Sequence, residues 1–364
     1  MELNLPMDGK EMVSDASSYT KDGSLDYHGQ PAVKRRTGGW RCGLLLLVNQ
    51  GLANLAFAGV EMNMVLFAKS VLRQTNEEAA NTFSRLMGTL YISSLMGAFL
   101  SDSYLGRYIT CVVFQVVSVI GFVALSISTH SFLLKPQGCG KIGQQCDPHS
   151  SSEIALFYIS IYLIAIGNGA PEPALATFGA DQFDEEDPKE KQSKSSFYSY
   201  FYAALNLGYL FSQTVLVYVE NIGYWVLVFW ICAGCVIFAF LLLLSGTFRY
   251  RRFRPSGNPL SRFSQVIVAS FRKINLQVPS NGKELYEVYE RENETINSRR
   301  ILHTNDFKFL DRAAIMTPVE MNMTATSNGR NPNPWYLCTV TQVEEVKCIL
   351  RFPLHRSMQG RLMP

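Results

Sequence analysis

Apolar residues in this chain are concentrated in long runs that end at Thr247. A helix needs roughly 20 mostly apolar residues to cross the core of a bilayer. Six runs reach about that length, over residues 42–67, 84–102, 108–129, 154–176, 197–219 and 224–247. Buried helices of soluble proteins are seldom this long and apolar six times in succession. The pattern therefore predicts an all-α membrane protein with six spanning helices.

Lysine and arginine are unevenly divided between the two ends of these six helices. Twelve lie near the helix ends on the side that holds both termini, and five lie on the other side. Because positive charge accumulates on the cytoplasmic side of membrane proteins, both termini are expected in the cytoplasm, with the plasma membrane favoured. Anionic lipid then accounts for the net charge of +3, and no nucleic-acid partner is implied.

Composition changes along the chain predict four segments. Residues 1–40 are polar and are expected to form a disordered cytoplasmic tail, ahead of a six-helix bundle over 41–248. Residues 249–351 read as a cytoplasmic central loop that contains amphipathic helices. Residues 352–364 form an atypical tail, in which Pro353 and the charged residues exclude a further spanning helix.

A short loop between the second and third predicted helices combines an acid, a glycine and a base. Asp102, Gly106 and Arg107 stand in a D-x-x-x-G-R pattern within "SDSYLGRY". The glycine suits a tight turn, and the acid and base can pair or cap the adjacent helix ends. The loop resembles the signature loop of the major facilitator superfamily, and the resemblance implies a gating role during alternating access.

A longer combination of motifs resembles one family within that superfamily. "GADQFD" is followed by FY-x-x-x-N-x-G, then by "FKFLD" and "WYLCTVTQVEEVK". This set is similar to the proton-dependent oligopeptide transporter family and, within it, to the plant nitrate/peptide transporters of the branch linked to long-distance nitrate movement. The resemblance implies the N-terminal six-helix half of a major facilitator fold. It implies a transporter with no cofactor and no catalytic or metal site, and it gives no support for an enzyme.

Three polar residues share one face of the predicted fifth helix. Tyr198, Tyr202 and Asn206 follow each other at intervals of four residues. An amide on a membrane helix is costly unless it faces a cavity or a neighbouring helix. Helix packing alone would explain Asn206, whereas the family resemblance favours a substrate cavity.

The sequence departs from the family pattern at its charged positions. Where the family usually carries E-x-x-E-R in helix 1, this chain has Gln50, Ala53 and Asn54. Where the family has a lysine before a proline in helix 4, this chain has Glu172 between Pro171 and Pro173. We hypothesise that Glu172 is the main cavity carboxylate and sets ion preference. The alternative is that it merely meets water at the cytoplasmic mouth.

Two further sites are suggested by residue type. Cys139 and Cys146 lie together in an outer loop and can form a disulfide if that side is oxidising. Thr110, at the start of the third helix, resembles a position that can be phosphorylated in the family. From the sequence alone, a simple polar helix start is the commoner explanation.

Two functions remain open. The first is a membrane transporter for nitrate or another small ion, a proton or a cation included, present as a half that needs a second copy or a full-length transporter to complete it. The second is a non-transporting isoform that pairs with full-length transporters and regulates them. Both readings place the chain in the lipid bilayer.

Overall fold

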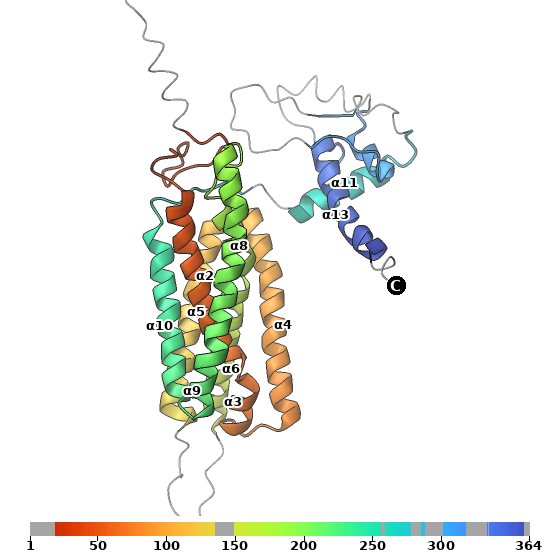
Figure 1. The fold of residues 1–364 in the computed structure, drawn as a ribbon. Helices are drawn as coiled ribbons and strands as arrows, with labels where there is room; N and C mark the ends of the chain where they lie inside the picture. The colour runs from red at the N-terminus through yellow and green to blue at the C-terminus, as the bar shows by residue number, and fades with distance from the viewer. Residues whose placement is uncertain are drawn as a thin grey trace, which may run out of the picture. The chain divides into compact units, whose positions relative to one another are not determined.

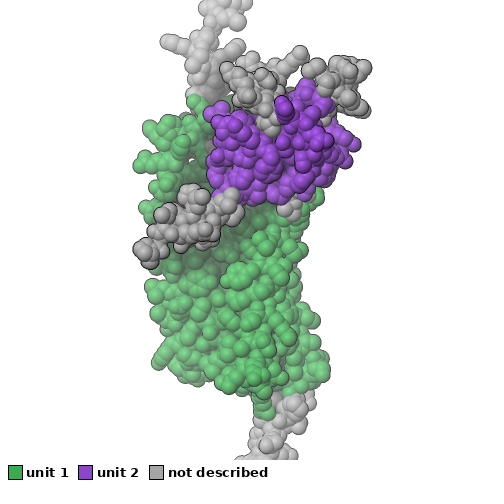
Figure 2. Space-filling model, turned by 90° about the vertical axis from the view of Figure 1, so that its right-hand side faces the viewer, with its two compact units in different colours: residues 1–255 green, residues 256–364 purple. Residues whose placement is uncertain are grey.

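The computed structural model describes residues 19–134, 149–255, 259–277, 285–287, 301–317, 333 and 335–359. The chain divides into two compact units, residues 1–255 and residues 256–364 (Figure 2). Within the described ranges the secondary structure is helical, apart from isolated β-bridges near the N-terminus.

Unit 1 is a bundle of helices that run alongside one another (Figure 1). Its α-helices are α2 (Gly39–Glu61), α3 (Met64–Ser70), α4 (Asn76–Leu100), α5 (Arg107–Ser128), α6 (Ser151–Gly169), α7 (Pro171–Ala180), α8 (Pro188–Phe211), α9 (Val217–Asn221) and α10 (Trp225–Ser245). Single π-helical turns extend three of them: η1 (Ser101–Leu105), η2 (Thr129–Leu133) and η3 (Ser212–Leu216). Each of the six predicted runs lies on one long helix or on two consecutive helices.

Four stretches of described helix are long and apolar enough to cross a membrane: Gly39–Ser70, Arg107–Leu133, Ser151–Ala180 and Trp225–Ser245. They account for four of the six predicted spans. The other two predicted spans lie on α4, with 25 residues, and on α8, with 24. The first turns of α8 are polar, "PKEKQSKSS", so that the apolar part of this helix is shorter.

Close backbone contacts between helices rest on glycines. A Cβ on Gly167 would overlap the backbone of Ser118 in α5, and one on Gly169 would overlap the Leu90 carbonyl in α4. Lipid tails are as apolar as leucine, so membrane helices gain association energy from such close packing and not from water exclusion. The glycines of α6 therefore fix the distance between α4, α5 and α6.

The helix that carries Glu172 is interrupted as its prolines predict. The first helix ends at Gly169, and the second begins with Pro171 at its first position. Proline lacks a backbone N–H and clashes with the preceding turn in a helix interior, but it fits the first turn of a new one. The result places Glu172 in the first turn of α7.

The N-terminal segment differs from its prediction. Residues 1–18 lie outside the described residues, but residues 19–38 are not the disordered tail expected for 1–40. Leu25 exchanges two backbone hydrogen bonds with Arg252, each 2.9 Å long, and Gly38 donates to the Arg249 carbonyl at 2.8 Å. The segment is as polar as a disordered tail. It is ordered because its backbone groups form hydrogen bonds with the residues that follow α10.

Unit 2 contains α11 (Pro259–Arg272), the 3₁₀-helix η5 (Lys308–Ala314) and α13 (Val340–Gln359). Val266, Leu310 and Val343, one from each element, belong to its small apolar core. The two amphipathic segments expected in the central loop are therefore helical. The second continues through residues 352–359, where the sequence predicted an atypical tail.

Candidate functional site

One small internal cavity of unit 1 brings together three of the predicted site residues. Gln50 and Asn54 from α2 and Glu172 from α7 line a space of about 20 Å³. Polar side chains from the neighbouring helices complete its lining: Asn49, Gln115, Ser118 and Asn168. A cavity needs about 10–15 Å³ to hold one water molecule, so this space accommodates a water or a small ion.

The asparagine side chains of α2 that line this cavity also form hydrogen bonds with neighbouring helices. Asn49 donates to the Ala239 carbonyl of α10 at 2.6 Å and to Gln115 of α5 at 3.3 Å. Asn54 donates to the Leu205 carbonyl of α8 at 2.9 Å. Asn54, which stands where the family usually has a charged residue, thus ties α2 to α8, and Asn49 ties α2 to α5 and α10.

Glu172 itself is exposed, and it forms no ion pair with any of the described residues. A lone carboxylate at the edge of a polar cavity attracts cations and repels anions unless it is protonated. The hypothesis that Glu172 sets ion preference stays a prediction.

The three polar residues of α8 do not line this cavity. Tyr202 is 64% exposed and Tyr198 37% exposed. Asn206 is also exposed, and its amide donates to the Tyr202 carbonyl of its own helix at 2.7 Å. Their spacing places them on one face, as predicted, but their role in substrate binding stays a prediction.

The D-x-x-x-G-R loop has a partner that its sequence does not show. Gly106 adopts a positive φ of 78°, which a residue with a side chain rarely does. The Arg107 guanidinium lies 3.7 Å from Asp102, the expected partner. It makes much closer contacts, at 2.5 and 2.6 Å, with both carboxylate oxygens of Asp181 after α7. Through Arg107, the D-x-x-x-G-R loop thus connects the start of α5 to the loop between α7 and α8.

Thr110 is fully buried in α5. Its hydroxyl donates to the Gly106 carbonyl at 3.0 Å. A kinase would reach this hydroxyl only after local opening of the helix start. The proposed disulfide between Cys139 and Cys146 lies outside the described residues.

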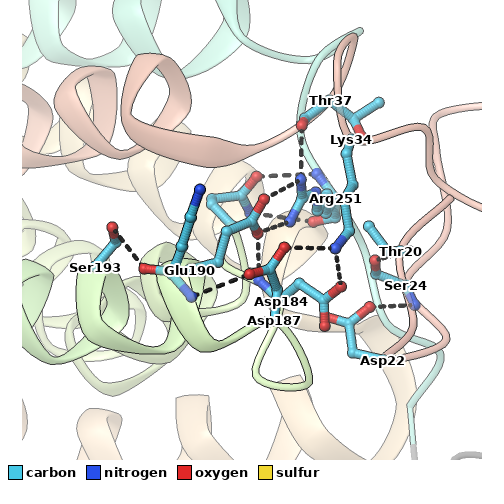
Figure 3. A network of polar contacts seen from close by, with 12 residues as sticks. Thr20, Asp22, Ser24, Lys34, Thr37, Asp184, Asp187, Glu190, Ser193 and Arg251 are labelled. Carbon is cyan, nitrogen blue, oxygen red and sulfur yellow. Dashed lines mark hydrogen bonds and ion pairs between the residues drawn. The ribbon is translucent and has the colours of Figure 1, made fainter. Parts of the chain in front are cut away.

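A polar network joins three distant segments at the end of the bundle that bears Arg107 (Figure 3). The Lys34 ammonium, ahead of α2, lies 3.1 Å from Asp184 and 2.9 Å from Asp187. Burial alone would raise the pKa of Asp184. Hydrogen bonds from the Lys21 backbone and the Lys34 side chain outweigh burial and hold that pKa below its usual value. The carboxylates of the α7–α8 loop therefore bind the N-terminal segment electrostatically.

Arg251, which follows α10, occupies the centre of this network. Its guanidinium is fully buried, 2.7 Å from Glu190 and 3.1 Å from the Thr37 carbonyl. Gln182 exchanges two hydrogen bonds with the Arg251 backbone, at 2.9 and 3.1 Å. Sequence reasoning missed this residue, because a basic residue after a membrane helix is usually explained by lipid headgroups.

The sequence that forms most of these helices matches a known protein family. Residues 108–354 match the family model described as the POT family. The chain belongs to the POT family. Members of this family are transporters and not enzymes. The match confirms the predicted family, and the helical structure confirms an all-α fold, in which four of the six predicted spans are long and apolar enough to cross a membrane.

Relatives of this POT family chain occur in Arabidopsis thaliana. Protein NRT1/PTR FAMILY 7.3 is 53% identical over 337 residues, which cover 91% of this chain and 54% of the relative. Protein NRT1/PTR FAMILY 7.1 is 50% identical over 313 residues, which cover 86% of this chain and 50% of the relative. The chain thus spans about half the length of these curated relatives.

Solved structures of POT family transporters share the fold. The structure of PepTSo has a TM-score of 0.53 at 20% identity. The superposition covers 66% of this chain and 43% of the PepTSo chain. An auto-inhibited POT family peptide transporter has a TM-score of 0.52 at 22% identity, with the same coverage. At these identities the similarity concerns the fold and not the substrate.

Proposed function

We propose that this chain forms one half of an alternating-access carrier for nitrate or another small ion. The observation that carries the proposal is the water-sized polar cavity lined by Gln50, Asn54 and Glu172 inside a POT family half-bundle. Substrates of such two-half carriers bind near the midplane where the halves meet. A cavity of this size within one half accommodates a small ion or a water molecule.

The ion that this half accepts depends on the charge of Glu172. As a carboxylate it favours a cation; as a neutral acid it admits nitrate and carries a proton with it. In this proposal the bundle over 41–248 and the central loop over 249–351 belong to this half, residues 19–38 attach to the bundle, and α13 continues beyond the central loop to Gln359. The lysine and arginine distribution supports a cytoplasmic location for both termini, and we propose the plasma membrane as the membrane that holds the protein.

The Arg107–Asp181 contact gives the proposed half its rigidity. It joins the start of α5 to the end of α7, while α7 carries Glu172. Rocking of one half against the other requires each half to move as one body. In this proposal Asp102, Gly106 and Arg107 therefore act on the gate by holding helices of the same half together.

The decisive experiment is flux into liposomes with three protein compositions: this chain alone, a full-length relative alone, and both together. Nitrate uptake is followed with a labelled ion, and cation flux with a potassium-selective dye. Flux from this chain alone, or from this chain with itself as second half, supports the carrier function. A chain that lowers the flux of the full-length relative without any flux of its own supports the regulatory alternative.

A further inference from the structure

One buried carboxyl of unit 1 has no charged partner among the described residues. Glu220, in α9, is only 1% exposed. One of its oxygens accepts a hydrogen bond of 2.9 Å from the side-chain amide of Asn63, and the other oxygen has no hydrogen-bond partner. Within the described part of the chain, no lysine, arginine or histidine pairs with it.

The partner of Glu220 marks the break in the first membrane helix. Asn63 stands between the end of α2 at Glu61 and the start of α3 at Met64. The same amide lies 3.3 Å from the Asn221 side chain and 3.4 Å from the Val217 carbonyl. Figure 1 shows α3 and α9 at the same end of the bundle. The break between α2 and α3 is thus fastened to α9 through one side chain.

The interior next to Glu220 is tightly packed. Ser212 and Leu216 precede Glu220 at intervals of four residues on the same helical face, and both are buried. A Cβ on Gly59 would lie 2.8 Å from the Cys232 sulfur and 3.0 Å from Leu216, so the helices that carry these residues pack closely here. Cys232 of α10 is the titratable group on which a charged Glu220 would act; Asn63 and Asn221 do not titrate.

An ionised carboxylate is costly in this place. A buried charge without a counterion loses its hydration, and a single amide donor replaces only part of it. The neutral acid retains the hydrogen bond from Asn63 and avoids this cost. A buried ionisable residue without a counterion in a membrane protein is a candidate for a function that depends on its protonation.

We propose that Glu220 is a proton-binding site that controls the break between α2 and α3. While the contact between Asn63 and Glu220 is closed, the carboxyl holds its proton. When the contact opens and water enters, the proton passes to water and leaves a hydrated carboxylate. This site is independent of Glu172 and of the identity of the substrate. It offers a proton-carrying group in a chain whose helix 1 lacks the family's acids.

The test is infrared spectroscopy of the full chain in lipid, which needs no transport activity. The wild-type protein at neutral pH should show the C=O stretch of a protonated carboxylic acid, and Glu220→Gln should remove one component of that band. Glu61→Gln and Glu172→Gln serve as matched controls and should leave this component in place. Asn63→Ala should shift its frequency upward, because the carbonyl loses its hydrogen bond.

A second measurement follows the break itself. Spin labels introduced through unnatural amino acids at Leu66 and Tyr218, which are 42% and 66% exposed, report the distance between α3 and α9. The distance should increase at alkaline pH in the wild type and stay short in Glu220→Gln. An acid band unchanged by Glu220→Gln in a folded variant would overturn the proton assignment. A distance that does not depend on pH would overturn the coupling.

Discussion

The Arg107 guanidinium contacts both carboxylate oxygens of Asp181, at 2.6 and 2.5 Å, although the nearest acid in sequence is Asp102. Asp181 is nearly buried, with 10% of its side chain exposed, whereas 45% of the Asp102 side chain is exposed. Charge-assisted hydrogen bonds are stronger where water is excluded. The pair therefore holds the start of α5 to the end of α7 more firmly than the local pair could.

Asp181→Asn is expected to destabilise the bundle. It removes the counterion of a half-buried guanidinium, which costs about 1–3 kcal/mol for a hydrogen bond to a charged group. Thermal unfolding in detergent, followed by tryptophan fluorescence, measures the shift in Tm. Asp102→Asn is the matched control and should shift Tm much less, since its contact with Arg107 is 3.7 Å long. Equal shifts for the two variants would contradict this ranking.

Lys34→Met should weaken attachment of the N-terminal segment by about 1 kcal/mol, the upper end for ion pairs that remain partly exposed. The pKa values of Asp184 and Asp187 are lowered by their contacts, so the stabilisation is present above their ordinary value of 3.8 and is lost as pH falls through the lowered values. The pKa of Lys34 is raised above 10.5, although its burial opposes this, because hydrogen bonds to Asp187 and Asp184 prevail.

The difference between Lys34→Met and wild type should therefore be constant between about pH 5 and pH 10 and should vanish in strong acid. Hydrogen exchange of residues 19–38 across this range provides the measurement. Lys21→Met is the control, because Lys21 binds Asp184 through its backbone N–H, which the substitution leaves in place. A similar loss of protection in both variants would argue against the side-chain ion pair.

Arg251→Met should weaken the attachment of residues 19–38 more than Lys34→Met does. The substitution removes the contacts to Glu190 and to the Thr37 carbonyl at once and leaves that carboxylate without its cation. The expected cost is about 3 kcal/mol, the lower end for breaking a buried ion pair, since Glu190 keeps some exposure. Trypsin cleavage after Arg35 and Arg36 should become faster in the variant. Glu190→Gln retains a hydrogen-bond acceptor for Arg251 and should cleave at an intermediate rate.

The sequence predicted those features that depend on local composition. A long apolar run predicts a spanning helix because the thickness of the bilayer sets the length that is needed. Pro171 predicts a helix boundary because its ring excludes it from a helix interior. The partners of Arg107, Lys34 and Arg251 depend on contacts between segments far apart in the chain. A polar segment such as 19–38 is not distinguishable from a disordered tail until its partners are known.

The sequence likewise identified only some of the residues that line the cavity. Gln50, Asn54 and Glu172 were found because the family resemblance aligned them with charged positions, and the structure places all three on one cavity. Asn49 and Gln115 were missed, since an amide on a membrane helix gives no sign of the helix it faces. Glu220 was missed because it follows the last residue of a predicted span, where carboxylates usually meet water.

Glu172→Gln tests the ion preference of the complete carrier, with the substitution placed in a full-length protein that contains this half. A carboxylate repels nitrate and a neutral acid does not, so nitrate uptake by the wild type should rise as pH falls through the titration of this group. The amide is neutral at every pH, and uptake by the variant should be high and independent of pH. Cation uptake should change in the opposite direction and fall in the variant. Glu77→Gln, at an exposed carboxylate in the first turn of α4, is the control and should retain the wild-type pH profile. Labelled-nitrate uptake at four or five pH values, with the membrane potential clamped, distinguishes these outcomes; identical profiles for Glu172→Gln and wild type would remove Glu172 from the site.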